Sequence, residues 1–355
     1  VFSALSFFTD TPELRLFGDG NTWQSIVGAS ALLWIVHFLI LRGVQTAASI
    51  NLVATLAKLL PLGLFVVLAM MMFKLDTFKL DFTGLALGVP VWEQVKNTML
   101  ITLWVFIGVE GAVVVSARAR NKRDVGKATL LAVLSALGVY LLVTLLSLGV
   151  VARPELAEIR NPSMAGLMVE MMGPWGEIII AAGLIVSVCG AYLSWTIMAA
   201  EVPFLAATHK AFPRIFARQN AQAAPSASLW LTNICVQICL VLIWLTGSDY
   251  NTLLTIASEM ILVPYFLVGA FLLKIATRPL HKAVGVGACI YGLWLLYASG
   301  PMHLLLSVVL YAPGLLVFLY ARKTHTHDNV LNRQEMVLIG MLLIASVPAT
   351  WMLVG

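Results

Sequence analysis

Three glutamates stand inside long apolar stretches of this sequence, where an ionised group is expensive. They are Glu110, Glu201 and Glu259. A carboxyl group in such surroundings usually faces a cavity or a polar partner, or it stays neutral and hydrogen-bonded between helices. No arginine lies within the same stretches, and Lys58 is the well-embedded cation. The pattern therefore favours a bound cation or proton beside these acids, with a buried neutral carboxyl as the alternative. For Glu259, a pair with Lys58 or a position at a helix end is a further alternative.

Glu110 has the most informative surroundings, Trp104-Val105-Phe106-Ile107-Gly108-Val109-Glu110-Gly111. Each of the two glycines weakens a helix by about 1 kcal/mol. A break there frees backbone groups, which a membrane tolerates only where they line a cavity, and discontinuous helices of this kind build substrate sites in transporters. The Trp104 ring lies where it could stack on an ammonium or guanidinium group. The alternative is that the glycines only allow close helix packing.

Composition places these groups in a membrane. The chain has 355 residues, of which 60% are hydrophobic and 11% charged, and its mean hydropathy is +0.94. Soluble domains are roughly 45–50% apolar and about 25% charged, so a water-soluble globular protein is excluded. The four cysteines (Cys189, Cys235, Cys239 and Cys289) all lie in apolar runs, where thiols pack as small hydrophobes. We expect no disulfide framework, no metal site and no cofactor.

Ten stretches approach the roughly 20 residues that a helix needs to cross the bilayer. They are Trp23–Leu41, Leu52–Phe73, Trp92–Val115, Thr129–Ala152, Pro174–Ala207, Ala227–Leu245, Asn251–Leu273, Ala283–Ala298, Met302–Leu319 and Met336–Val354. The first apolar stretch, Val1–Phe8, is too short to span and is interpreted as the end of an earlier helix. We therefore expect the natural protein to have further N-terminal helices.

Positive charge alternates between the loops. Fifteen lysines and arginines fall in one alternating set of loops and five in the other, and loops rich in these residues stay cytoplasmic. The bias predicts that the loop Arg118–Lys127 is cytoplasmic and that the last helix ends outside. The net charge of +5 then needs no nucleic acid to explain it, although the basic loop is also suited to anionic lipid.

The order of motifs resembles that of a known transporter family. Trp104–Gly111 and the basic loop Ala117–Lys127 resemble the sixth helix and following loop of the amino acid–polyamine–organocation transporters, and more narrowly of the bacterial basic amino acid antiporters. Ser194-Trp195-Thr196, Glu201-Val202-Pro203 and Phe212–Ala217 resemble the eighth helix and its cytoplasmic loop. Val263-Pro264-Tyr265 falls where the tenth helix would be.

The resemblance implies an all-α integral membrane protein with the LeuT-like fold of two inverted five-helix repeats plus additional C-terminal helices. Residues 1–73 would hold the end of helix 3 and helices 4 and 5. Residues 92–273 would be the second repeat, helices 6–10, and residues 283–355 would form helices 11–13. The family's first helix carries a glycine-rich break that holds the substrate, and this sequence has no counterpart of it. We therefore expect this chain alone not to transport.

The resemblance also assigns roles to individual residues. Substrate contacts are expected from Trp104, Ile107, Gly108, Trp195 and Ser258, and gate or coupling roles from Glu110, Tyr265, Glu201 and Glu259. Trp195 and Tyr265 would belong to one inner gate layer. Glu201 lies six residues beyond Trp195, so it points about 120° away on a straight helix; an exit-path acid and a structural hydrogen bond are both open readings.

The function implied is exchange of basic amino acids across the bacterial inner membrane by alternating access, most narrowly arginine for ornithine. Arginine/agmatine or lysine/cadaverine exchange is the alternative. Basic amino acids and membrane lipid are the expected partners, and a homodimer is a further expectation. A membrane enzyme is disfavoured because His303 stands alone and His325 and His327 lie in a charged loop. A channel is disfavoured because repeated filter loops are absent from the sequence.

Overall fold

The computed structural model describes residues 2, 5, 9–10, 14, 16–18, 20–43, 59–80, 82–114, 116, 121–159, 162–247, 250–325, 331 and 333–354. Within these ranges the secondary structure is helical, without strands. Several features singled out above fall outside them: most of the N-terminal remnant at 1–8, residues 52–58 of a predicted span (Lys58 included), residues 117–120 of the basic loop, and His327.

The chain divides into two compact units, each described by itself below. The first unit comprises residues 1–88, 108–205 and 216–249, and the second comprises residues 89–107, 206–215 and 250–355. The boundary between residues 107 and 108 falls inside the Trp104–Gly111 motif. The second unit therefore contains the helix before the predicted break, and the first unit contains the glutamate after it.

The first unit is built mainly from long apolar helices. Its elements are α2 (Trp23–Leu41), a helix at Leu59–Met72, α4 (Leu75–Lys79), the short 3-10 helix η1 (Leu85–Leu87), α6 (Gly111–Val114), α7 (Lys122–Val150), α8 (Arg153–Glu158), α9 (Ser163–Met172), α10 (Pro174–Thr208, as far as Leu205) and α11 (Ser226–Thr246). The second unit contains α5 (Val91–Phe106), α12 (Tyr250–Ile275), α13 (Pro279–Ser299), α14 (Pro301–His325) and α15 (Arg333–Val354), and the 3-10 helix η3 (Arg214–Ala217) begins in it.

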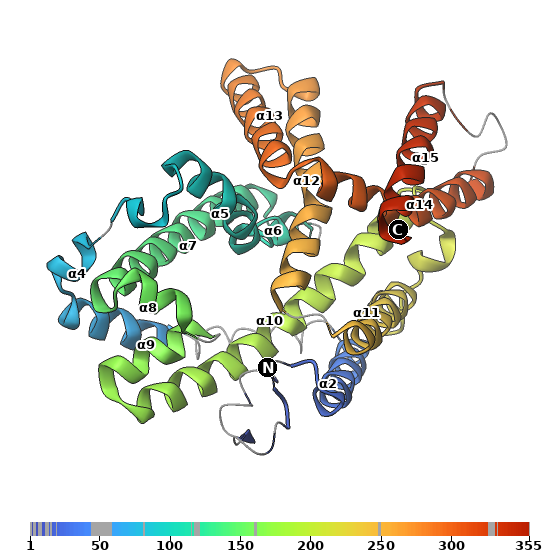
Figure 1. Cartoon of the computed structure of the whole chain (residues 1–355). Helices are drawn as coiled ribbons and strands as arrows, with labels where there is room; N and C mark the ends of the chain where they lie inside the picture. Colours follow the sequence, from blue (N-terminus) through green and yellow to red (C-terminus); the bar gives the residue numbers. More distant parts are fainter. Residues whose placement is uncertain are drawn as a thin grey trace. The chain divides into compact units, whose positions relative to one another are not determined.

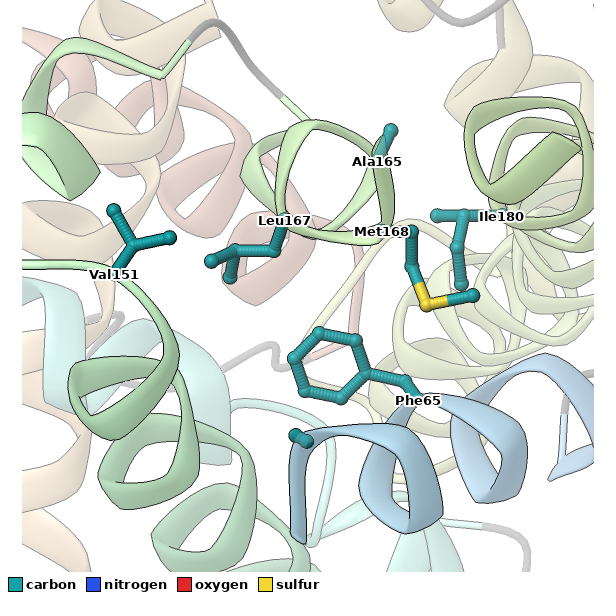
Figure 2. Packing of buried hydrophobic residues seen from close by; sticks show 7 residues of the cluster. Phe65, Val151, Ala165, Leu167, Met168 and Ile180 are labelled. Carbon is teal, nitrogen blue, oxygen red and sulfur yellow. The ribbon is translucent and has the colours of Figure 1, made fainter. Parts of the chain in front are cut away.

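Two apolar clusters hold the first unit together. In one, Phe65 packs with Leu167 and Met168 of α9 and Ile180 of α10, as Figure 2 shows. In the other, Val36 and Ile40 of α2, Leu193 and Ala200 of α10 and Leu229 of α11 form a buried set. Because lipid tails are as apolar as these side chains, the clusters act through close van der Waals packing, which holds α10 against α2, α9 and α11.

A polar contact is buried between α2 and α11. The Asn233 Nδ2 and His37 Nδ1 atoms lie 2.8 Å apart, and both side chains are almost completely buried. Close by, Trp34 Nε1 donates to Gln237 Oε1 at 3.2 Å, and Gln237 Nε2 donates to Ser30 Oγ at 2.9 Å. Hydrogen bonds between helices of this kind stabilise membrane packing where small polar side chains meet.

The second unit is organised around α12. The α12 helix lies against α13, α14 pairs with α15, and α5 contacts both α12 and α13 (Figure 1). Leu103 of α5, Leu262 of α12 and Leu295 of α13 are the buried residues of its core cluster. Arg322 of α14 and Glu335 of α15 form a salt bridge of 2.8 Å between them. Because α12 touches α5, α13 and α14, its shape affects the whole unit.

Helix ends follow from local chemistry. Thr22 precedes α2, and its hydroxyl accepts a hydrogen bond from the Ser25 N–H, the usual N-cap arrangement. Gly247 ends α11 with φ +66° and ψ +18°, the left-handed conformation that glycine adopts at a helix C-terminus without a Cβ penalty. A single residue therefore marks the start of α2, and another marks the end of α11.

Six of the helices in the described residues are long and apolar enough to cross a membrane. They are Trp23–Leu41, Asp124–Val150, Pro174–Thr208, Ser226–Thr246, Ala257–Ile275 and Pro279–Ser299. The α7 window has no buried residue, as expected for a helix that faces lipid on most of its surface. All-α integral membrane architecture is therefore confirmed, whereas the inverted repeats and the three-part division at 1–73, 92–273 and 283–355 stay predictions.

Helix bounds agree with the hydropathy predictions to within a few residues, with two kinds of exception: the predicted span Trp92–Val115 is interrupted after Phe106, and polar residues extend some helices. The predicted start at Thr129 is wrong for α7, which begins at Lys122, and α14 continues from Leu319 to His325. Hydropathy marks only the hydrocarbon part of a helix, and charged turns continue it into water. The short helices α4, α8 and α9 were not expected, because each is too short to give a span signal.

Candidate functional site

The helix that carries Trp104 is broken where the glycines predict. The α5 helix ends at Phe106, residues 107–110 form a turn, and α6 begins at Gly111. Ile107 is extended, with φ −60° and ψ 129°, and Gly108 has φ +109°. A residue with a side chain rarely adopts such a φ, so the break requires glycine at position 108.

The freed backbone groups of the turn are partly satisfied within it. The Gly108 N–H donates to Glu110 Oε2 at 2.9 Å. The Gly108 carbonyl accepts from the Gly111 N–H at 2.9 Å, and the Glu110 carbonyl accepts from Val113 and Val114. The glutamate therefore closes the turn with its own carboxyl group.

Trp195 of α10 covers the turn. A Cβ added to Gly108 would lie 2.8 Å from the Trp195 Cζ2 atom, and one added to Gly111 would collide with the Met198 side chain. Trp195 thus lies against Gly108, and Glu110 bonds to the same glycine; the substrate and gate roles of the three residues stay predictions. Met198 was missed, because its contact with Gly111 depends on how α10 packs and no motif marks it. Both glycines serve close approach as well as the break, so the two readings given for them hold together.

The predicted residues of the second unit lie on α5 and α12, which contact one another. Trp104 is partly buried in the last turn of α5. Ser258 and Glu259 are buried on α12, and the Ser258 hydroxyl donates to the Leu254 carbonyl at 2.8 Å. Tyr265 packs against the Leu103–Leu262–Leu295 cluster. The predicted gate layer of Tyr265 with Trp195 stays a prediction.

Glu201 lies on the same helix as Trp195 but on another face. Glu201 is 3% exposed and Trp195 is 42% exposed, which agrees with the expected angle of about 120° between them. Pro203 follows two residues later inside α10. Both readings, an exit-path acid and a structural hydrogen bond, remain compatible with this burial.

The described residues hold no metal-binding cluster and no disulfide. No group of three or more His, Cys, Asp or Glu side chains there could hold a metal ion, and all four cysteines are free thiols. A surface pocket of the first unit contains none of the predicted site residues; it is lined by Thr77, Phe78, Leu80, Phe82, Leu148 and Arg153. The broken helix therefore remains the candidate site.

These features define a multi-pass membrane protein with a discontinuous helix, a class in which secondary transporters are prominent. The family model described as "Amino acid permease" matches residues 1–343. The chain belongs to this amino acid permease family, and its relatives and spans place it in the bacterial inner membrane.

Curated relatives match most of the chain. An arginine/ornithine antiporter of Pseudomonas aeruginosa is 44% identical over 342 residues, which are 91% of this chain and 70% of the relative. An arginine/agmatine antiporter of Chlamydia caviae is 41% identical over 331 residues, 88% of this chain and 68% of the relative. An arginine/agmatine antiporter of Chlamydia pneumoniae is 38% identical over 353 residues, 93% of this chain and 73% of the relative.

Proposed function

We propose that this protein exchanges basic amino acids across the bacterial inner membrane, with arginine and ornithine as the pair. The observation that carries the proposal is the broken helix, in which a carboxylate stands at a glycine turn inside a family of amino acid permeases. The name of the Pseudomonas relative supports the arginine/ornithine pair. The names of the Chlamydia relatives keep arginine/agmatine exchange as the second candidate.

Glu110 is proposed to act as the coupling acid of the exchange. Its carboxylate closes the turn by accepting from the Gly108 N–H, so a cationic substrate that approaches this oxygen competes with the backbone for it. Substrate arrival and a change in the turn would then be linked at one atom. Charge-assisted hydrogen bonds of this type are worth about 1.5–3 kcal/mol, which is enough to select a cation over a neutral amino acid.

Aromatic and small polar side chains are proposed to complete the site. Trp104 would stack on the side chain of the substrate, with an attraction of about 0.5–2 kcal/mol for a cation on an indole face. Ile107 and Gly108 would offer backbone groups of the turn, and Ser258 would exchange its intrahelical hydrogen bond for one to the substrate. Trp195 would cover the turn from the inner side. Tyr265 would be an aromatic gate residue, and Glu201 and Glu259 would be acidic gate residues.

Exchange by alternating access needs no ATP and no sodium site in this proposal, since the substrate gradients drive it. A ligand shifts a two-state equilibrium only by its difference in affinity for the two states. Obligatory exchange follows if the empty carrier converts between its inward-open and outward-open states much more slowly than the loaded one.

Counterflow in liposomes tests the proposal. The full-length protein is reconstituted into vesicles loaded with ornithine, and uptake of labelled arginine is followed. We expect uptake to require internal ornithine and to saturate with external arginine. Equal uptake into empty vesicles would contradict obligatory exchange.

The same vesicles separate the candidate pairs. Loading with agmatine, lysine or cadaverine in place of ornithine ranks the internal substrates at equal concentration. Faster arginine uptake against agmatine than against ornithine would favour the second candidate function. Uptake that does not depend on the charge of the internal amino acid would contradict a role for Glu110 in selection.

A further inference from the structure

The α12 helix contains a proline in its apolar part, Pro264. Proline has no N–H, so the carbonyl four residues earlier loses its helical hydrogen bond. In α12 that carbonyl belongs to Met260. Within a membrane, a freed carbonyl is tolerated when a neighbouring helix supplies a donor. The Met260 carbonyl therefore needs a hydrogen-bond donor from outside its own helix backbone.

Tyr311 of α14 supplies the donor. Its hydroxyl donates to the Met260 carbonyl oxygen at 2.6 Å, within the normal range for an O–H···O hydrogen bond. Tyr311 is partly buried, and α14 contacts α12 in the same unit. A side chain 51 residues further along the chain thus replaces the hydrogen bond that Pro264 removes.

The contact lies beside the predicted site residues of α12. Met260 follows Ser258 and Glu259 directly, and Tyr265 follows Pro264. The segment between the proline and its freed carbonyl therefore joins the predicted substrate contact to the predicted gate aromatic. A helix bends most readily at such a segment, so a donor held there affects how these side chains are aimed.

The same arrangement occurs once more in the described residues, on α10. Pro203 frees the Ala199 carbonyl, and Thr232 Oγ1 of α11 lies 3.3 Å from that oxygen. Glu201 stands between the proline and the freed carbonyl. Thr232 also lies 3.0 Å from the Ser228 carbonyl of its own helix, so its single hydroxyl proton is shared. At both prolines, a hydroxyl of a neighbouring helix lies at the freed carbonyl.

We propose that Tyr311 is a positioning residue for exchange: by donating to the Met260 carbonyl it fixes the bend of α12 at Pro264 and so aims Ser258, Glu259 and Tyr265. This inference rests on the proposed function of those residues. It gives α14, which belongs to the C-terminal segment outside the predicted repeats, a direct part in the transport cycle. Tyr311 acts through the backbone and does not touch the substrate.

A double-mutant cycle between Tyr311 and Pro264 tests the inference. Tyr311→Phe removes the donor, and Pro264→Ala restores a backbone N–H that can serve Met260. In wild-type background we expect Tyr311→Phe to lower the turnover of arginine/ornithine exchange, per folded molecule, about tenfold, the scale expected when a buried carbonyl loses its donor. In the Pro264→Ala background the same substitution should change turnover less than twofold.

Tyr320→Phe is the matched control, because Tyr320 lies on the same helix and is 61% exposed; we expect wild-type turnover. Equal losses from Tyr311→Phe in both Pro264 backgrounds would overturn the inference. The inference would also be overturned if Tyr311→Phe lowered the amount of folded protein but left the turnover per folded molecule unchanged. That result would show that the contact serves folding alone. Pro264→Gly restores the same N–H and replaces the alanine variant if that variant does not fold.

The two proposals fail in different ways. Absence of exchange by the wild-type protein contradicts the proposed function, whereas normal wild-type exchange without coupling in the cycle contradicts the inference alone. Thermal unfolding of the wild type, the two single variants and the double variant tests the same coupling without substrate. Tyr311→Phe should lower Tm only when Pro264 is present. Identical Tm losses in both backgrounds would contradict the hydroxyl–carbonyl contact itself.

Discussion

The molecule interrupts its helices in two different ways, with glycine at residues 107–110 and with proline at Pro203 and Pro264. At the glycine turn the helix stops, and the chain satisfies its own backbone when Glu110 accepts from the Gly108 N–H. At the prolines the helix continues, and a hydroxyl from a neighbouring helix takes up the freed carbonyl. The first solution is local in sequence, and the second depends on packing.

The two kinds of interruption differ in how far each depends on neighbouring helices when it changes shape. A turn closed by its own carboxyl group can open when that group finds another partner, and the side chains that then have to adjust are Trp195 and Met198 of α10. A proline bend held by Tyr311 or Thr232 can change only together with α14 or α11. The glycine turn is therefore suited to sensing the substrate, and the proline bends are suited to transmitting the change.

The largest expected effect comes from breaking the glycine turn with Gly108→Ala. The alanine must adopt φ +109° and place its Cβ 2.8 Å from Trp195, at a cost of about 1–3 kcal/mol for the backbone alone. We expect a lower Tm and at least about a hundredfold loss of exchange, measured by thermal unfolding and counterflow. Gly138→Ala is the control, since an added Cβ there meets no atom within 4 Å in α7; it should leave exchange intact and stabilise slightly. A Gly108→Ala variant with normal exchange would contradict the importance of the break.

Removing the charge while keeping the turn should have the next largest effect. In Glu110→Gln the amide oxygen can still accept from the Gly108 N–H, so the fold should persist. We expect the half-saturating concentration of arginine to rise about ten- to hundredfold, the equivalent of about 1.5–3 kcal/mol for a charged hydrogen bond. Glu158→Gln on α8 serves as the control for removing a carboxylate elsewhere. Unchanged affinity in Glu110→Gln would remove Glu110 from the binding step.

Thr232→Val tests the hydroxyl at the Pro203 bend, for comparison with Tyr311→Phe at the Pro264 bend. Because the Thr232 hydroxyl is shared between Ala199 and Ser228, we expect a smaller effect than from Tyr311→Phe, with Tm lowered by about 2 °C or less. Thr246→Val, which removes a hydroxyl bonded within its own helix, should shift Tm less still. A larger loss of Tm from Thr232→Val than from Tyr311→Phe would contradict the expectation that the hydroxyl at Pro264 contributes more than the one at Pro203.

The smallest effect is expected at Asp10, outside the spans, where a carboxylate again closes a backbone turn. Its oxygens accept from the Phe17 N–H at 3.0 Å and the Gly18 N–H at 2.7 Å, and the bond from Phe17 lowers the pKa of Asp10 below its ordinary value. A lowered folded-state pKa contributes stability above the unfolded-state pKa of about 3.9, and that stability is lost as pH falls through the lower value. Asp10→Asn should therefore have a slightly lower Tm than wild type at pH 7 and an equal Tm at strongly acidic pH. A Tm difference that grows as pH falls would contradict this assignment.

The local features of the site could be predicted from the sequence. Glycines at 108 and 111 predict the break, and apolar length alone predicts α2 with both ends correct. The packing partners could not be predicted. Met198 behind Gly111 and Tyr311 at Met260 depend on which helix faces join, and a single sequence carries no signal for that. Pro264 does predict a freed carbonyl at Met260. The donor to that carbonyl lies 51 residues away on α14, and the sequence does not predict that α14 packs against α12.

The buried amide–imidazole contact between α2 and α11 has a consequence for biosynthesis. Its two residues are 196 positions apart, so at a synthesis rate of about 5–20 residues per second the histidine waits roughly ten to forty seconds for its asparagine to be translated. During that interval the first of the two helices must reside in the bilayer, or beside the insertion machinery, with its imidazole lacking its native partner. Assembly of this pair is thus a late event in the life of a nascent chain, because α2 is translated long before α11, the helix that completes its burial.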